Sequence, residues 1–138
     1  MKTLKSIFLG LALLIAGNSA FASNQNPLSK NDVLSIYVDA LVHGKIGNVD
    51  AVLDKNVKHT VYRGEKQFKL DKKQIMESLK ATENIEQGCT FNTQISEETD
   101  NSMVVKLTMK YETYTRVNTI IISSEKGDFK ITKIETQA

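Results

Sequence analysis

The sequence contains little cysteine, proline and histidine, and it has no tryptophan. Among 138 residues there is one cysteine, Cys89, one proline, Pro27, and two histidines, His43 and His59. A single cysteine excludes an intramolecular disulfide, and it excludes the clustered cysteines of a structural zinc site. No Cys–His signature indicates a catalytic thiol, so we expect Cys89 to be a small buried hydrophobic residue.

A hydrophobic run long enough to cross a membrane is also missing. The apolar run Ile7–Ala16 (IFLGLALLIA) is about half of the roughly 20 residues that a spanning helix needs. It follows Lys2 and Lys5 and precedes Ala20 and Ala22, which offer small residues at positions −3 and −1 of a cleavage site. This order is typical of a Sec-type secretory signal. No cysteine follows the site for lipid attachment, so we expect a soluble mature chain without a membrane anchor, in the periplasm or secreted.

The excess of positive charge belongs to this expected signal. Residues 1–22 hold two of the 18 basic residues and none of the 16 acidic ones, so 18 − 2 = 16 basic residues remain against 16 acidic ones. A near-neutral mature chain has no field to attract nucleic acid, and we expect no nucleic-acid partner. We interpret residues 23–27 as a polar arm and residues 28–138 as one domain, since such a length suffices for a single core.

Helical signals occupy the first half of the mature chain. Ser29 with Asp32, and Asp71 with Gln74, are spaced as capping boxes, and Gly44 is suited to a left-handed helix end. Apolar residues recur with helical period after each box. These patterns predict three helices, at residues 29–44, at residues 48–53 with Asn48 as the cap, and at residues 71–79. His43 then lies in the last turn of the first helix, where the helix dipole alone explains a histidine.

The second half alternates apolar and polar residues with a period of two, which is typical of strands. We predict strands at residues 57–63, 68–70, 89–95, 103–111, 116–123 and 129–131. Ile134 is out of step with Phe129 and Ile131, which indicates a β-bulge. Helices followed by a meandering antiparallel sheet predict the α+β class.

This order of elements resembles the nuclear transport factor 2-like superfamily. The stretches LSKNDVLSIYVDALVHGKIGNVDAVLDKNVKHTVYRG and YTRVNTIIISSEKGDFKITKI are similar to its small exported members, called SnoaL-like or lumazine-binding-type proteins. The resemblance implies a cone-shaped fold, in which N-terminal helices pack on a curved antiparallel sheet around an apolar pocket, and it implies a homodimer. It implies no particular reaction, because the superfamily includes isomerases, dehydratases, cyclases and proteins that only bind.

In such a cone, the inward parity of the strands selects the residues that line the pocket. The candidates are Tyr37, His59, Arg63, Phe91, Met109, Tyr111, Arg116 and Asn118. For the fifth strand the choice between the parity of Arg116, Asn118 and Ile120 and that of Thr115 and Val117 stays open. No carboxylate falls on an inward position, since Asp39, Asp50, Asp54 and Glu112 all have solvent-side parity.

Two functions remain open from the sequence. The first is an exported small-molecule-binding or accessory domain, whose ligand could be anionic and held by the arginines. The second is an isomerase-, dehydratase- or cyclase-like enzyme that uses His59, although the sequence predicts no partner for it; His59 could equally be a core residue. A cystatin-like inhibitor shares the outline but lacks an inhibitory loop motif. We expect no metal and no cofactor, because the histidines and acids lack the spacing of ligands.

Overall fold

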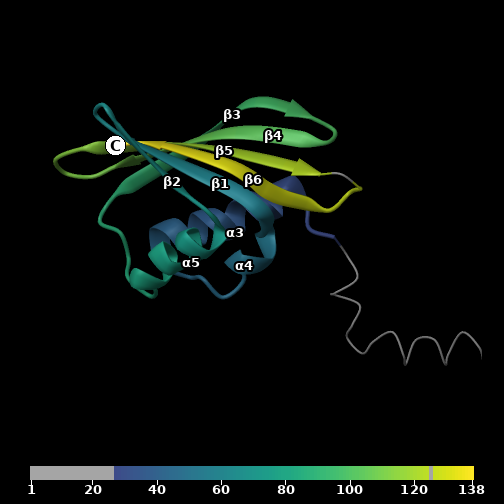
Figure 1. The fold of residues 1–138 in the computed structure, drawn as a ribbon, viewed down its shortest axis with the longest axis horizontal. Coiled ribbons are helices and arrows are strands. Elements are labelled where there is room, and N and C mark those ends of the chain that lie inside the picture. Colours follow the sequence, from purple (N-terminus) through teal and green to yellow (C-terminus); the bar gives the residue numbers. More distant parts are fainter. Residues whose placement is uncertain (1–26, 125) are drawn as a thin grey trace, which may run out of the picture.

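The computed structural model describes residues 27–124 and 126–138. The expected signal peptide, and the expected arm up to residue 26, lie outside these residues. The elements are the helices α3 (Lys30–His43), α4 (Val49–Val52) and α5 (Lys72–Ala81), and the strands β1 (Leu53–Arg63), β2 (Lys66–Leu70), β3 (Thr90–Thr99), β4 (Ser102–Lys110), β5 (Thr115–Ser124) and β6 (Phe129–Gln137). All three helices lie on one side of the sheet, so the predicted α+β class is confirmed (Figure 1). Within the described part of the chain, no helix is long and apolar enough to span a membrane.

Helix α3 begins and ends where the sequence predicts. Ser29 Oγ accepts a hydrogen bond from the backbone of Asp32 at 3.1 Å, and Asp32 Oδ2 accepts one from the backbone of Ser29 at 3.0 Å. The carboxylate of Asp32 also lies at the positive end of the helix dipole. Gly44 ends the helix in the left-handed region, with φ of 70°. Helix α5 begins with the same reciprocal pair, between Asp71 and Gln74.

The segment after α5 crosses directly over the end of α3. The backbone N–H of Asn84 donates to the carbonyl of Gly44, and that of Gln87 donates to the carbonyl of Val42, both at 2.8 Å. These bonds satisfy carbonyl groups that the end of a helix leaves free. The C-terminal end of α3 is therefore capped by backbone N–H groups from a distant part of the chain.

The short helix α4 and the start of β1 differ from the prediction. The helix ends at Val52 rather than Leu53. Asn48 is its N-cap residue as predicted, but the Asn48 side chain makes no capping hydrogen bond. Strand β1 begins at Leu53, four residues before the predicted Val57. Its pairing with β6 is irregular between Leu53 and Lys58, and this interruption hides the alternation on which a sequence prediction depends.

The six strands form one sheet in the order β2-β1-β6-β5-β4-β3. Neighbours pair antiparallel, except β1 and β6, which are parallel. In β6 the register shifts, since Ile121 of β5 pairs with Lys133 while Ile122 pairs with Ile131. The bulge predicted near Ile134 is confirmed, and it lets Ile131 and Ile134 both be buried.

The core lies between the helices and the central strands. Met103, Val105, Leu107 and Met109 of β4 are buried, and so are Asn118, Ile120 and Ile122 of β5. The sequence left open which face of this strand points inward. The burial pattern shows that the face with Arg116, Asn118 and Ile120 lies toward the helices.

Edge strand β3 is exposed along its whole length. Phe91 and Ile95 pair with Met109 and Val105, so they lie on the helix side of the sheet, as their parity predicts. They are nevertheless 42% and 48% exposed, because α3 packs over β5 and β6 and leaves β3 uncovered. Phe91 therefore lies outside the cavity described below, in a shallow hollow between α3 and β3.

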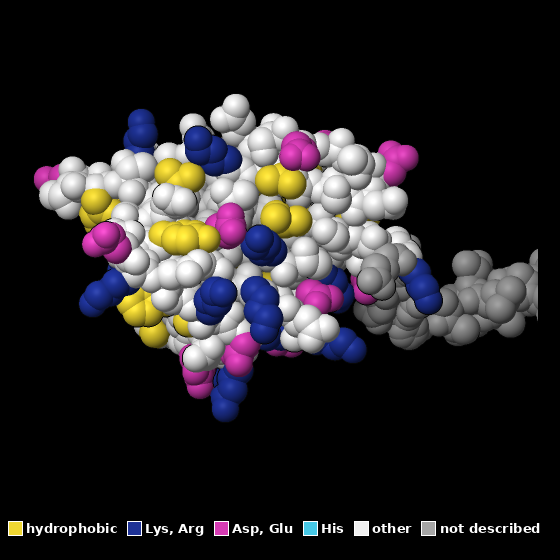
Figure 2. Space-filling model, turned by 45° about the horizontal axis from the view of Figure 1, so that its top comes forward, with side chains coloured by type: hydrophobic (Ala, Val, Ile, Leu, Met, Phe, Trp, Pro, Cys, Tyr) yellow, Lys and Arg dark blue, Asp and Glu magenta, His cyan; other side chains and the backbone are white. Residues whose placement is uncertain are grey.

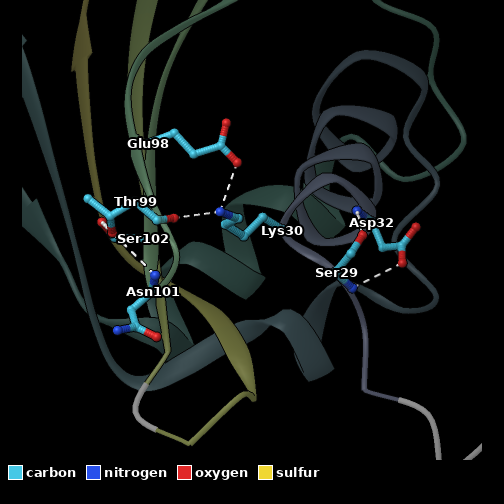
Figure 3. A network of polar contacts seen from close by, with 7 residues as sticks. All are labelled: Ser29, Lys30, Asp32, Glu98, Thr99, Asn101 and Ser102. Carbon is cyan, nitrogen blue, oxygen red and sulfur yellow. Dashed lines mark hydrogen bonds and ion pairs between the residues drawn. The ribbon is translucent and has the colours of Figure 1, made fainter.

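A polar network attaches the start of α3 to the turn between β3 and β4 (Figure 3). Lys30 Nζ lies 2.8 Å from Glu98 Oε2 and donates to the carbonyl oxygen of Thr99 at 2.6 Å. The Thr99 hydroxyl in turn accepts from the backbone of Asn101. The network holds the otherwise uncovered edge strand against the helix.

None of the helices in the described part of the chain covers the outer face of the sheet, and on this face apolar side chains are scattered among lysines and acids (Figure 2). Val104, Val117 and Ile121 belong to this face and are partly exposed. The structure holds one copy of the chain, so the expected homodimer stays a prediction.

Candidate functional site

One cavity opens between the helices and the first, second, fifth and sixth strands. Its volume is about 340 Å³, which is at the small end of ligand pockets. Its lining residues are Tyr37 and Leu41 of α3, His59, Val61 and Arg63 of β1, Phe68 and Leu70 of β2, Ile75, Ser78 and Leu79 of α5, Arg116 and Asn118 of β5, and Thr136 of β6.

The structure brings five of the eight candidate residues together around this cavity. They are Tyr37, His59, Arg63, Arg116 and Asn118. Alternation along β1 and β5 explains their convergence, because side chains two apart on a strand share a face. Arg63, at the end of β1, is exposed, whereas Asn118 is buried.

The other three candidates lie elsewhere. Met109 is fully buried in the core, and Phe91 stands against the ring edge of His43 with 6.2 Å between ring centres. Tyr111 stacks on Tyr114 and donates its hydroxyl hydrogen to Gln87 at 3.0 Å. Phe91 lies in β3, Met109 in β4 and Tyr111 directly after β4, and neither of these strands lines the cavity.

The sequence reasoning missed Thr136, although a signal for it was present. The bulge places Ile134 on the inward face, and Thr136 shares that parity as the next residue but one. The contributions of β2 and α5 were also missed, because only the tertiary fold brings Phe68, Leu70 and Ser78 to the same space.

A hydrogen-bonded chain of side chains runs along the sheet side of the cavity. The Thr136 hydroxyl donates to Asn118 Oδ1 at 2.6 Å, and His59 Nε2 lies 2.7 Å from the Thr136 oxygen. Because a hydroxyl has one hydrogen, His59 Nε2–H is the donor to Thr136. Asn118 Nδ2 ends the chain by donating to Met109 Sδ at 3.5 Å. This chain leaves His59 Nδ1 as the acceptor nitrogen of a neutral ring.

Burial and charge together keep His59 neutral. Burial lowers the pKa of His59, and the nearby Arg116 guanidinium lowers it further, to about 4 from the ordinary 6.5. Burial also raises the pKa of Tyr37 well above its ordinary value of 10, although Arg116 opposes that change. At neutral pH both side chains are therefore uncharged next to a permanent cation.

Acidic side chains are absent from the described lining of the cavity. Of the four acids expected on the solvent side, Asp50 and Glu112 are exposed, and Asp39 and Asp54 are partly exposed outside this cavity. His43 lies apart from His59 and pairs with Glu86 Oε2 at 2.6 Å. Across residues 27–124 and 126–138, no group of three or more histidine, cysteine, aspartate or glutamate side chains could hold a metal ion. Cys89 is free and partly buried against the core.

No protein-family model and no curated protein matches the sequence. Solved structures do match its fold. An NTF2-like protein of unknown function from Silicibacter pomeroyi has a TM-score of 0.62 at 7% identity, covering 77% of this chain and 89% of that one. One from Shewanella baltica has a TM-score of 0.60 at 7% identity, covering 77% and 87%.

A candidate ketosteroid isomerase from Parabacteroides distasonis is similar in fold as well. Its TM-score is 0.54 at 14% identity, and the match covers 83% of this chain and 89% of that one. Identities this low carry no information on the reaction or the ligand, since one fold supports many functions. The matched structures agree with the arrangement described above, in which helices pack on a six-stranded sheet. The chain therefore has the nuclear transport factor 2-like fold.

Proposed function

We propose that this chain is a small-molecule-binding domain, with the ligand held in the cavity between α3, α5 and the sheet. The observation that supports the proposal is a cavity with mainly apolar walls and a few polar groups gathered on the sheet side. This combination is typical of binding sites, in which apolar surface contributes affinity and a few polar groups determine orientation.

Substitutions at the mouth of the cavity test the proposal. Ser78 is exposed and lines the cavity, so Ser78→Trp should obstruct it without entering the core. Glu77→Trp is the matched control, because Glu77 is exposed on the same helix but does not line this cavity. We expect a panel of small acids, nucleotides and flavin-like rings to contain a ligand that raises the melting temperature of the wild type and of Glu77→Trp, but not of Ser78→Trp. Binding at a hundred times the dissociation constant stabilises a protein by about 2.7 kcal/mol.

Native mass spectrometry of the same three proteins provides a second readout. A retained small molecule in the wild type and in Glu77→Trp, lost in Ser78→Trp, would support the proposal. An equal thermal shift in all three proteins, or no shift with any compound, would contradict it.

A second candidate function is an isomerase-, dehydratase- or cyclase-like enzyme that uses His59 as a base. It is favoured by the hydrogen bond to Thr136, which orients the ring and leaves Nδ1 with a free lone pair. The low pKa of His59 opposes it, because a base with a pKa of about 4 has little driving force to accept a proton at neutral pH. Binding is for this reason the first proposal.

The substitution His59→Gln tests whether the fold holds this ring neutral, and its effect on stability should depend on pH. Below pH 6.5 the unfolded wild type takes up a proton at His59, whereas the folded protein does so only near pH 4. The free energy of unfolding of the wild type should therefore fall between about pH 6.5 and 4, by up to about 3 kcal/mol. Glutamine keeps a donor for Thr136 and does not titrate, so urea denaturation of His59→Gln should lack this loss. Equal pH dependence of both proteins would show that His59 is not held neutral by the fold.

A further inference from the structure

Arg116 brings a positive charge into the cavity that no acidic side chain of the described residues balances. It lies near the start of β5 and is partly buried. Its Nε atom is buried and has no hydrogen-bond partner among residues 27–124 and 126–138. The ion pairs found within these residues leave Arg116 out, and none of the cavity's lining residues is an acid. A buried donor without a partner costs about 1–3 kcal/mol, more when it is charged, so such groups in native proteins call for an explanation.

The neighbouring side chains provide no negative charge to balance Arg116. His59 and Tyr37 are both uncharged beside the guanidinium, and the His59 N–H is already donated to Thr136. The Asn118 oxygen accepts from Thr136, and its amide nitrogen donates to Met109. His59, Thr136 and Asn118 are therefore bonded to one another or to Met109, whereas the buried Nε of Arg116 has no partner among the described residues.

Most of the remaining lining is apolar. Leu41, Val61, Leu70, Ile75 and Leu79 surround the space, and Phe68 lies at its exposed side. A water molecule in the liquid occupies about 30 Å³. If each non-hydrogen atom of a ligand takes the same volume, a cavity of about 340 Å³ holds on the order of ten such atoms. Arg63 also lines the cavity, but it is exposed, and solvent screens its charge.

We infer that the ligand is a small organic monoanion, a carboxylate on an aliphatic or aromatic body, with its head on the Arg116 guanidinium and its body among the apolar side chains. The inference rests on the proposed binding function and specifies the class of ligand. Arginine suits this role because its planar fork makes two parallel hydrogen bonds to a carboxylate. The carboxylate would balance the guanidinium charge, since no acid among the described residues lines the cavity.

Pairs of acid and amide of equal shape test the inference. The probes are octanoate with octanamide and indole-3-acetate with indole-3-acetamide, measured by isothermal titration calorimetry at neutral pH. We expect the wild type to bind at least one acid ten or more times as tightly as its amide. Arg116→Gln should abolish this preference and change the affinity for the amide by less than about threefold. Arg116→Lys should keep part of the preference, because it retains the charge without the planar fork.

Lys58→Gln is the matched control and should keep the preference for the acid, since Lys58 is an exposed cation on β1 that does not line the cavity. Circular dichroism melting of each variant checks that the fold is intact. Equal affinity for acid and amide in the wild type, or a preference that survives in Arg116→Gln, would overturn the inference and leave the binding function standing. Binding of none of the four probes would also overturn it, while the broader panel with Ser78→Trp decides separately whether the cavity binds anything.

Discussion

Replacing Gly44 by alanine should destabilise the fold by about 2–5 kcal/mol. A side chain in the left-handed region costs about 1–2 kcal/mol, and forcing an extra carbon into a packed site costs about 1–3 kcal/mol more. The added Cβ would lie 2.5 Å from Asn84 N, 2.6 Å from Ile85 N and 2.7 Å from Thr82 O. All three are backbone atoms, which cannot rotate away as a side chain could, so we expect a value near the upper end. Urea denaturation followed by circular dichroism measures it.

Gly64→Ala is the matched control for this substitution. Gly64 has a φ of 61°, close to the 70° of Gly44, but a Cβ there would meet nothing within 4 Å. The two variants therefore share the backbone strain and differ in the collision. Equal destabilisation in both would show that the segment crossing over α3 does not confine Gly44.

The substitution Ile120→Ala should lower the free energy of unfolding by about 2–5 kcal/mol. Ile120 lies in the middle of β5, is fully buried, and stands between Val105 of β4 and Ile134 of β6. These neighbours are held in strands on both sides and cannot collapse into the space that the lost atoms leave. Chemical denaturation with fluorescence or circular dichroism detection checks the value.

The same change at Ile95 of β3 is the control. Ile95 has the same parity relative to the core but is 48% exposed, so Ile95→Ala should cost less than about 1 kcal/mol. A large loss at Ile95 would mean that β3 is covered in solution by something absent from the structure of the single chain.

The difference between Ile120 and Ile95 also shows how far the sequence could be interpreted. Alternation predicted the face of both residues, because it depends only on neighbours in the chain. Both capping boxes, the left-handed end at Gly44 and the bulge near Ile134 were predictable for the same local reason. Coverage of the sheet by a helix is not a local property, and nothing in the residues around Ile95 indicates that α3 packs over β5 and β6 rather than over Ile95.

The same distinction between local and long-range features applies to the candidate site. Tyr37, His59 and Arg116 were predictable from parity once a resemblance to a cone-shaped fold was available. The bond between His59 and Thr136 was not, since it joins residues 77 positions apart in the sequence. Parity places the acids on the solvent side, and among the described residues no acid lines the cavity. This absence determines the ligand class that we infer.

The strand order has a consequence for how this chain is made. Strand β6 (Phe129–Gln137) lies between β1 and β5, and those two strands do not pair with each other. During synthesis on the ribosome, five strands emerge before the one that joins them. Until residues 129–137 are available, β1 and β5 each present an open edge, of the kind that recruits strands from other chains. The sheet can therefore be closed only after residues 129–137 have been made, and the chain depends until then on whatever shields those edges.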